Sequence, residues 1–259
     1  MKLVSKILGL ALVCTLFMAF GPQCEDQDTA MSSKKPALAP DQILVFTKTA
    51  GYRHGSIEKG VATLKELSKA HNFEITHTED AEQFNPDVLD KYALVIFLST
   101  TMDVLGNDQQ RSFEGYIRSG GSFMGIHAAS DTEYNWPWYG KLVGAYFESH
   151  PNNPNVRQAK MDVLDKAHPA TAHLEDTWVR KDEWYNYKNI NPDLKVLINL
   201  DESSYEGGTN GENHPIAWYH EFDGGRAFYT GGGHTKASYD EPNFQKHLLG
   251  GILYCLNRE

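Results

Sequence analysis

Four short strand-like runs in the first half of the sequence alternate with segments that have the period of an α-helix. The runs are QILVF (42–46), FEITHT (73–78), YALVIFL (92–98) and SFMGI (122–126). A helix is predicted to begin after Ser56, which can cap it, and another is predicted in 107–121 with Asn107 as its cap. Strands and helices that alternate at this spacing indicate a parallel sheet with helices on both faces. We therefore predict an α/β fold.

The second half of the sequence is less regular and predicts an added β-hairpin region. Its strand candidates are 156–164, 195–200, 215–222 and 225–230. The turn sequence Asp223-Gly224-Gly225 separates the last two candidates and predicts a hairpin. A final helix is predicted over 242–257, opened by Pro242.

The first 24 residues have the pattern of an export signal. Lys2 and Lys6 precede an apolar run, 7–20, that is too short to form a transmembrane helix. Cys24 is placed for lipid attachment, but Gly21 stands where such signals usually have an aliphatic residue, so a lipid anchor is left open. We predict a signal peptide at 1–24, a flexible tether at 25–40 and one domain at 41–259. An exported protein would act in the periplasm or at the cell surface.

Charge and cysteine content exclude two classes of function. The full chain has a net charge of −10, and removing the leader deletes Lys2 and Lys6 and no acid, which gives −12. No basic run is present in 41–259, so nucleic acid is not an expected partner. Beyond Cys14 and Cys24 the only cysteine is Cys255, which lies in an apolar stretch. Neither an intramolecular disulfide nor thiol catalysis is expected.

The fourth strand ends at a histidine framed by small residues. Gly125 precedes His127 by two positions and Ala129 follows it by two, a pattern typical of a sharp strand-to-helix elbow. Such elbows usually present a serine or cysteine nucleophile. An imidazole there could be a general base, a metal ligand or a polar contact to substrate. Asp131 could orient His127, bind substrate or cap the next helix.

Further polar clusters follow other strands, where ligands bind in open α/β sheets. Tyr52, Arg53 and His54 share the loop after the first strand, and these side chains are suited to gripping hydroxyls or carboxylates. The motif KDEWYNY places Glu183 beside Trp184 and Tyr185; acids next to aromatic rings suit sugar recognition, and they also occur in ordinary packed strands.

Several histidines have the chemistry of metal ligands but no metal-binding spacing. The candidates are His54, His127, His150, His214 and His234, together with Glu183. They would have to converge through the fold, so a divalent metal is one possible cofactor and the ligand set is left open.

Four ordered motifs resemble those of the ThuA-like family, the trehalose-utilisation proteins. They are ILVFTKTAGYRHGSI, GSFMGIHAASDT, DEWYNY and HPIAWYHEFDGGRAFYTGGGHT. The resemblance spans about 42–257 and implies the fold of class I glutamine amidotransferases, a flavodoxin-like parallel sheet with an elbow after one strand. In that superfamily the elbow residue is a cysteine nucleophile. His127 stands there in this sequence, as is usual for ThuA-like proteins, so the resemblance does not imply glutamine hydrolysis.

The resemblance implies a role in the breakdown of trehalose-like disaccharides or their 3-keto derivatives. The first hypothesis is an isomerase, lyase or glycoside hydrolase in which His127 or Glu183 moves a proton. The second is a non-catalytic carbohydrate-binding protein, and the third is a two-carboxylate glycosidase using Asp131 and Glu183. The catalytic candidates are His127, Glu183, His54 and Asp131. The substrate-binding candidates are Tyr52, Arg53, Trp184, Tyr185, His214 and His234.

Overall fold

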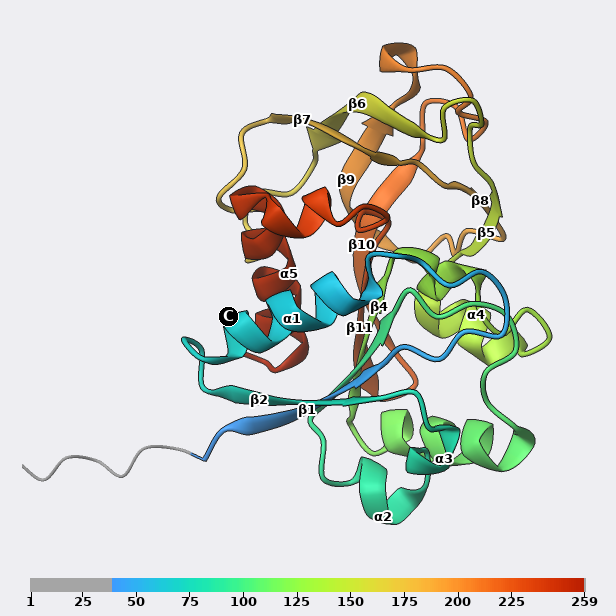
Figure 1. Ribbon diagram of the computed structural model, residues 1–259, viewed down its shortest axis with the longest axis vertical. Coiled ribbons are helices and arrows are strands. Elements are labelled where there is room, and N and C mark those ends of the chain that lie inside the picture. Colours follow the sequence, from blue (N-terminus) through green and yellow to red (C-terminus); the bar gives the residue numbers. More distant parts are fainter. Residues whose placement is uncertain (1–38, 259) are drawn as a thin grey trace, which may run out of the picture. The chain divides into compact units, whose positions relative to one another are not determined.

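The computed structural model describes residues 39–258 (Figure 1). The predicted signal peptide, Cys24 and all but the last two residues of the predicted tether lie outside the described residues. Within 39–258 no helix is long and apolar enough to cross a membrane.

A nine-stranded sheet forms the centre of the fold, in the order β2-β1-β3-β4-β11-β10-β9-β6-β7. Its parallel half consists of β2 (Phe73–Thr78), β1 (Asp41–Phe46), β3 (Leu94–Leu98), β4 (Ser122–Ile126) and β11 (Gly225–Thr230). Its antiparallel half consists of β10 (Pro215–Phe222), β9 (Lys195–Asp201), β6 (Val156–Val163) and β7 (Thr177–Glu183). A separate hairpin sheet pairs β5 (Tyr146–Ser149) with β8 (Asn186–Lys188). The predicted α/β fold is confirmed.

Helices cover both faces of the parallel half (Figure 1). On one face lie α1 (Ile57–Ser68) and α5 (Pro242–Cys255), and on the other lie α3 (Asn107–Arg118) and α4 (Pro137–Val143), with α2 (Pro86–Leu89) packed on α3. The central strands β3 and β4 are fully buried, because helices remove both of their faces from water. Short 3₁₀ turns are η1 (Ala81–Gln83), η2 (His127–Asp131), η3 (Glu202–Ser204) and η4 (Ala237–Asp240).

Two helix caps differ from the prediction. Ser56 precedes α1 but makes no capping bond, because its hydroxyl donates to the carbonyl of Gly233 at 2.9 Å. Gly106 is the residue before α3, so Asn107 is the first helical residue rather than the cap. The predicted hairpin turn is confirmed. Asp223 and Gly224 both have positive φ, 50° and 99°, as a two-residue type I′ turn requires.

Two glycines in different helices give a matched test of the packing of α5. A Cβ on Gly250 would lie 2.3 Å from the carbonyl oxygen of Pro169, whereas a Cβ on Gly115 in α3 would meet nothing within 4 Å. We expect Gly250→Ala to lower the free energy of unfolding by about 1–3 kcal/mol or more. Gly115→Ala should raise it by about 0.5–1 kcal/mol through lost chain entropy. Urea unfolding of both variants checks this; a Gly250→Ala protein as stable as the wild type would contradict the close approach of α5 to Pro169.

Candidate functional site

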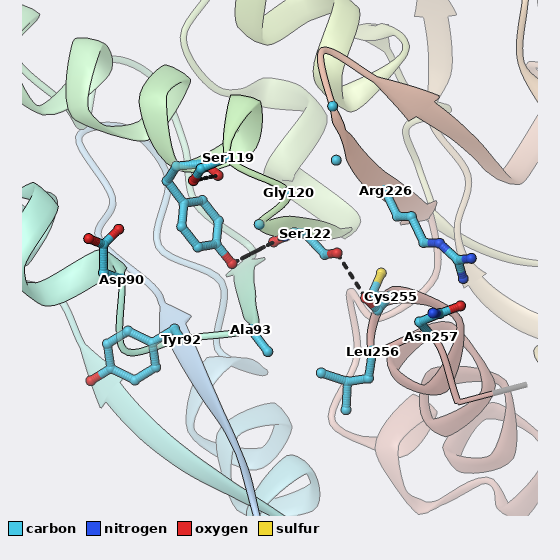
Figure 2. Close-up of a pocket in the computed structure, with 14 residues that line it drawn as sticks. Asp90, Tyr92, Ala93, Ser119, Gly120, Ser122, Arg226, Cys255, Leu256 and Asn257 are labelled. Carbon is cyan, nitrogen blue, oxygen red and sulfur yellow. Dashed lines mark hydrogen bonds between the residues drawn. The ribbon is translucent and has the colours of Figure 1, made fainter.

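Cavities lie at both ends of the parallel strands. The one at the amino ends has a volume of about 450 Å³ and is lined by Ser122, Gly225 and Arg226, among others (Figure 2). Its Ser122 hydroxyl donates to the carbonyl of Cys255 at 2.8 Å, and Arg226 donates to the carbonyl of Tyr254 at 2.9 Å. These polar groups are therefore engaged in holding the C-terminal helix. Ligands of open α/β sheets bind at the opposite, carboxyl end.

The predicted elbow lies at that carboxyl end. His127 follows β4 directly and has a φ of 51°, a left-handed conformation that is uncommon for a residue other than glycine. A Cβ on Gly125 would lie 2.9 Å from the ring of Tyr229 and 3.2 Å from the Cβ of Ala129. The small residues around His127 are thus needed for the chain to turn. Unlike an exposed nucleophile, the His127 side chain is completely buried.

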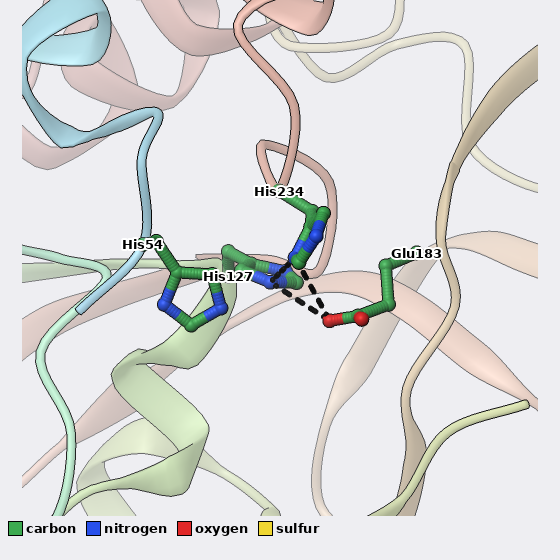
Figure 3. A group of neighbouring side chains, drawn as sticks. All are labelled: His54, His127, Glu183 and His234. Carbon is green, nitrogen blue, oxygen red and sulfur yellow. Dashed lines mark hydrogen bonds and ion pairs between the residues drawn. The ribbon is translucent and has the colours of Figure 1, made fainter. Parts of the chain in front are cut away.

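Four titratable side chains converge beside the elbow (Figure 3). His54, His127 and His234 come from the loops after β1, β4 and β11, and Glu183 is the last residue of β7. One nitrogen or oxygen from each lies within 4.8 Å of those of the others. Residues separated by up to 180 positions in the chain therefore form one cluster, which we call the His₃Glu cluster.

Three members of the His₃Glu cluster form a tight triangle. His127 Nε2 lies 3.4 Å from Glu183 Oε2 and 3.2 Å from His234 Nδ1, and His234 Nδ1 lies 2.9 Å from Glu183 Oε2. The ring of His54 lies edge-on to the other two imidazoles, with centroids 4.7 Å and 5.1 Å away.

The surroundings of the cluster set its protonation. Burial would raise the pKa of Glu183, but its hydrogen bonds to His127 and His234 outweigh this and hold the pKa well below its usual range. Burial, with the neighbouring His127 and His234, lowers the pKa of His54 to about 2. At neutral pH the cluster therefore contains an ionised carboxylate and a neutral His54.

Asp182, the residue before Glu183, holds the loop that carries His234. Its carboxylate is fully buried and accepts hydrogen bonds from the backbone N–H groups of Gly233 at 2.8 Å and His234 at 3.1 Å. It also accepts from the hydroxyl of Ser238 at 2.9 Å and pairs with Arg180 at 3.1 Å. Asp182 and Glu183 point to opposite sides of β7, so one supports the loop while the other reaches the cluster.

A pocket of about 300 Å³ opens onto the His₃Glu cluster. Aromatic rings of Tyr52, Phe147 and Tyr185 line it, and Tyr52 is two-thirds exposed. The remaining lining residues are polar: His54, Asp131, His150, Asn155, Glu183 and His234.

Two polar groups of the pocket stand beside the cluster rather than in it. Burial raises the pKa of Asp131, whose carboxylate accepts a 2.5 Å hydrogen bond from the hydroxyl of Tyr134. His150 donates from Nδ1 to the carbonyl of Pro151 at 2.9 Å, and its Nε2 lies 3.7 Å from Glu183 Oε1. The position of Asp131 at the end of η2, facing the pocket, shows that it does not cap the next helix.

Three residues expected to bind substrate lie outside the pocket. Arg53 is half-exposed and forms ion pairs with Glu58 and Glu79. Trp184 is fully buried, and its indole N–H donates to the carbonyl of Arg157. His214 bonds Glu202 and the carbonyl of Tyr185, each at 2.7 Å, so it supports the backbone behind the pocket wall.

Of the ten site candidates, the other seven lie in the cluster or in the pocket: Tyr52, His54, His127, Asp131, Glu183, Tyr185 and His234. Sequence reasoning missed Phe147 and Asn155, and it noted Asp182 beside the aromatic residues without predicting its supporting role. Asn155 donates from Nδ2 to Glu183 Oε1 at 2.6 Å. Nothing in the local sequence of Asn155 signals this, because it lies between predicted strands in a proline-rich loop.

Comparison with known proteins identifies the family. The family model for ThuA, described as trehalose utilisation, matches residues 42–255. The chain belongs to the ThuA family. No curated protein sequence matches it significantly.

Solved structures of ThuA-like proteins share the fold of this ThuA family member. One from Bacteroides uniformis is 23% identical with a TM-score of 0.73, over 86% of this chain and 94% of that one. Another, from Parabacteroides merdae, is 20% identical with a TM-score of 0.67, over 84% of this chain and 90% of that one. A β-galactosidase from Bacillus circulans sp. alkalophilus matches at 13% identity and a TM-score of 0.54, over 83% of this chain and 31% of its own.

Proposed function

We propose that this ThuA family member is an enzyme that converts a trehalose-like disaccharide or its 3-keto derivative in the pocket above the His₃Glu cluster. The observation that carries the proposal is the pocket itself: it combines a converged set of titratable groups with three aromatic rings. Pockets that shift the pKa values of several groups are typical of active sites. The family description, trehalose utilisation, supports a sugar as the substrate.

The pocket suits a sugar in size and lining. A volume of about 300 Å³ is at the small end of ligand pockets and excludes a polysaccharide chain from its interior. Aromatic rings pack against the apolar C–H faces of a sugar, while carboxylates and imidazoles accept or donate hydrogen bonds to its hydroxyl groups.

The His₃Glu cluster and Asp131 would have different roles in the reaction. The His₃Glu cluster would bind and polarise an oxygen of the sugar, and Asp131 would move a proton. In a 3-keto sugar the carbonyl acidifies the hydrogen on the adjacent carbon. A base that removes this proton yields an enolate, which can be reprotonated or can expel the neighbouring glycosidic oxygen. Asp131, with its raised pKa, is suited to such proton transfer.

Replacing Asp131 tests whether this carboxyl group transfers a proton. Asp131→Asn keeps an acceptor for Tyr134 but removes the titratable group, so we expect kcat to fall about 100-fold with little change in KM. Steady-state kinetics on the sugar that the wild type converts fastest, from a panel of disaccharides and their 3-keto derivatives, measures this. Asp176→Asn, at an exposed carboxylate paired with Lys166, is the matched control and should leave both constants unchanged. A variant with raised KM and unchanged kcat would make Asp131 a binding residue only.

The aromatic lining also favours a second candidate, a carbohydrate-binding protein without catalysis. A binder needs stacking surfaces such as Tyr52, Phe147 and Tyr185 but no group with a shifted pKa. Tight binding of a disaccharide, with no product after prolonged incubation, would support this candidate over the enzyme.

Two further parts of the proposal concern location and a missing activity. We propose that residues 1–24 direct export to the periplasm or cell surface. Mass spectrometry of the mature N-terminus tests this, and an intact Met1 in the native host would reject it.

We also propose that the protein has no glutamine amidotransferase activity, since a histidine occupies the elbow position where those enzymes have a cysteine.

A further inference from the structure

We propose that His54, His127, His234 and Glu183 bind one divalent transition-metal ion, best matched by Zn²⁺, at the base of the pocket. The inference adds a cofactor to the proposed function. Metal binding to the His₃Glu cluster can be measured separately from sugar conversion.

The spacing of the inner three ligand atoms fits a single ion. Zn²⁺ binds imidazole nitrogen and carboxylate oxygen at about 2.0–2.2 Å, so two ligands of a tetrahedral site lie about 3.3 Å apart. The three distances among His127 Nε2, His234 Nδ1 and Glu183 Oε2 are 2.9, 3.2 and 3.4 Å. A single ion placed near the centre of this triangle can bind all three atoms.

The outer hydrogen bonds orient two of the ligands. His127 donates from Nδ1 to the carbonyl of Gly231 at 2.9 Å, so Nε2 is the ring nitrogen that faces the cluster and would bind the ion. Asn155 donates to the other carboxylate oxygen of Glu183, which leaves Oε2 toward the histidines. Metal ligands are usually fixed by second bonds of this kind.

His54 supplies the fourth ligand and has no competing partner. His54 is 4% exposed, and its buried Nδ1 has no hydrogen-bond partner among the described residues. No hydrogen bond at Nδ1 therefore holds the ring in another orientation, and its other nitrogen is left to bind an ion in the cluster.

The charge and chemistry of the ligand set select the kind of ion. One carboxylate and three imidazoles suit borderline ions such as Zn²⁺, whereas Ca²⁺ and Mg²⁺ prefer sets made of oxygen atoms. Three of the four ligands, His54, Glu183 and His234, also line the pocket. An ion there would face the pocket, and a substrate oxygen would reach it as a fifth ligand.

The test is elemental analysis of the tag-free full chain, followed by Zn²⁺ titration after stripping with a chelator. We expect about one ion per chain and a rise in Tm when Zn²⁺ is returned to the stripped protein. Glu183→Gln and His127→Asn should each weaken Zn²⁺ binding by more than about 100-fold, more than the loss of an outer hydrogen bond costs. Co²⁺ in place of Zn²⁺ should give the visible absorption of a four-coordinate ion in the wild type and not in these variants.

A histidine variant outside the cluster and the pocket serves as the control. His173→Asn changes a histidine whose ring donates to the carbonyl of Asn243. It should bind Zn²⁺ as tightly as the wild type. If a cluster variant does not fold, the Tm shift and the Co²⁺ spectrum of the stripped wild type still decide.

The outcomes separate this inference from the proposed function. A stripped wild type with no Tm shift and no tighter Zn²⁺ binding than Glu183→Gln would overturn the metal site. A bound metal with no conversion of any sugar would keep the metal site and reject the enzyme. Full sugar conversion by the metal-free protein would keep the enzyme and overturn a role for the metal in it.

Discussion

Replacing Asp182 with asparagine is expected to lower the free energy of unfolding by about 3–5 kcal/mol, the usual cost of removing one partner from a buried ion pair. Asp182 is fully buried beside Arg180, whose side chain is only 3% exposed. Its two oxygens also accept from three backbone amides and from Ser238. An asparagine side chain has one acceptor oxygen instead of two and carries no charge, so it leaves donors unsatisfied and Arg180 less compensated.

The same variant should weaken the candidate metal site without touching a ligand. Asp182 binds the amides of Gly233 and His234, and Gly233 has a φ of 113° that few other residues adopt. Loosening this loop moves His234 relative to Glu183. We expect Zn²⁺ affinity to fall about 10–100-fold, as for other outer hydrogen bonds of metal ligands.

Glu241→Gln is the matched control for Asp182→Asn. Glu241 is the second carboxylate beside Arg180, at 3.0 Å, but its side chain is one-third exposed and bonds no part of the His234 loop. Its loss should cost below about 1 kcal/mol and leave metal affinity unchanged. Urea unfolding with a chelator present measures the stability of both variants. Equal effects of the two substitutions would show that Asp182 acts only as a partner of Arg180.

The parallel half of the fold was predictable because each strand there is a continuous apolar run. Strands such as β3 and β4 are buried on both faces, so their sequences carry no competing polar signal. Strand β7 was not predicted. It is an edge strand whose buried positions include Arg180 and Asp182, and their pairing with each other is visible only in three dimensions. A charged sequence of this kind reads as a loop.

The candidate site was partly predictable for a topological reason. The carboxyl ends of parallel strands meet at one edge of the sheet, so residues directly after β1 and β4 were expected to lie together. His54 and His127 do so, and His234 joins them because β11 runs parallel to β4. The contribution of Glu183 came from the resemblance and from its aromatic neighbours, not from topology, since β7 is at the far end of the sheet order.

Side-chain direction explains why other candidates lie elsewhere. Arg53 and His54 are adjacent on one loop, but the first faces solvent and the second the cluster. Trp184 follows Glu183 and packs in the core instead of lining the pocket. A one-residue difference reverses the direction of a side chain in an extended segment, and the sequence alone does not fix which residue points inward.

Acid is expected to destabilise the protein through a histidine far from the candidate site. His247 in α5 is 1% exposed, and its ring donates from Nδ1 to the carbonyl of Ala170 at 2.8 Å and accepts from the hydroxyl of Thr230 at 3.1 Å. Burial, which outweighs the opposing hydrogen bond to Ala170, lowers the pKa of His247 from 6.5 to about 3 together with smaller contributions from Arg180, His173 and His168. The folded protein therefore holds this ring neutral.

The direction of the pH effect follows from proton binding. Below pH 6.5 the unfolded chain takes up a proton at His247 that the folded chain does not, so stability falls as the pH decreases toward about 3. Above pH 6.5 both states are neutral and the full stability is present. Each pH unit within this window costs up to about 1.4 kcal/mol for one such group, which amounts to several kcal/mol over the whole window.

His247→Gln isolates this contribution, because an amide can also donate to one partner and accept from the other but does not titrate in this range. The variant should be less stable than the wild type at pH 7.5, since its packing is altered, yet its loss of stability between pH 6.5 and pH 4 should be smaller. Urea unfolding at a series of pH values, with a chelator present so that no metal contributes, measures both slopes. Histidines that remain in both proteins, such as His220 with its pKa lowered by burial, give an acid-dependent background that cancels in the comparison. Parallel pH profiles for the two proteins would mean that His247 is not held neutral in the fold.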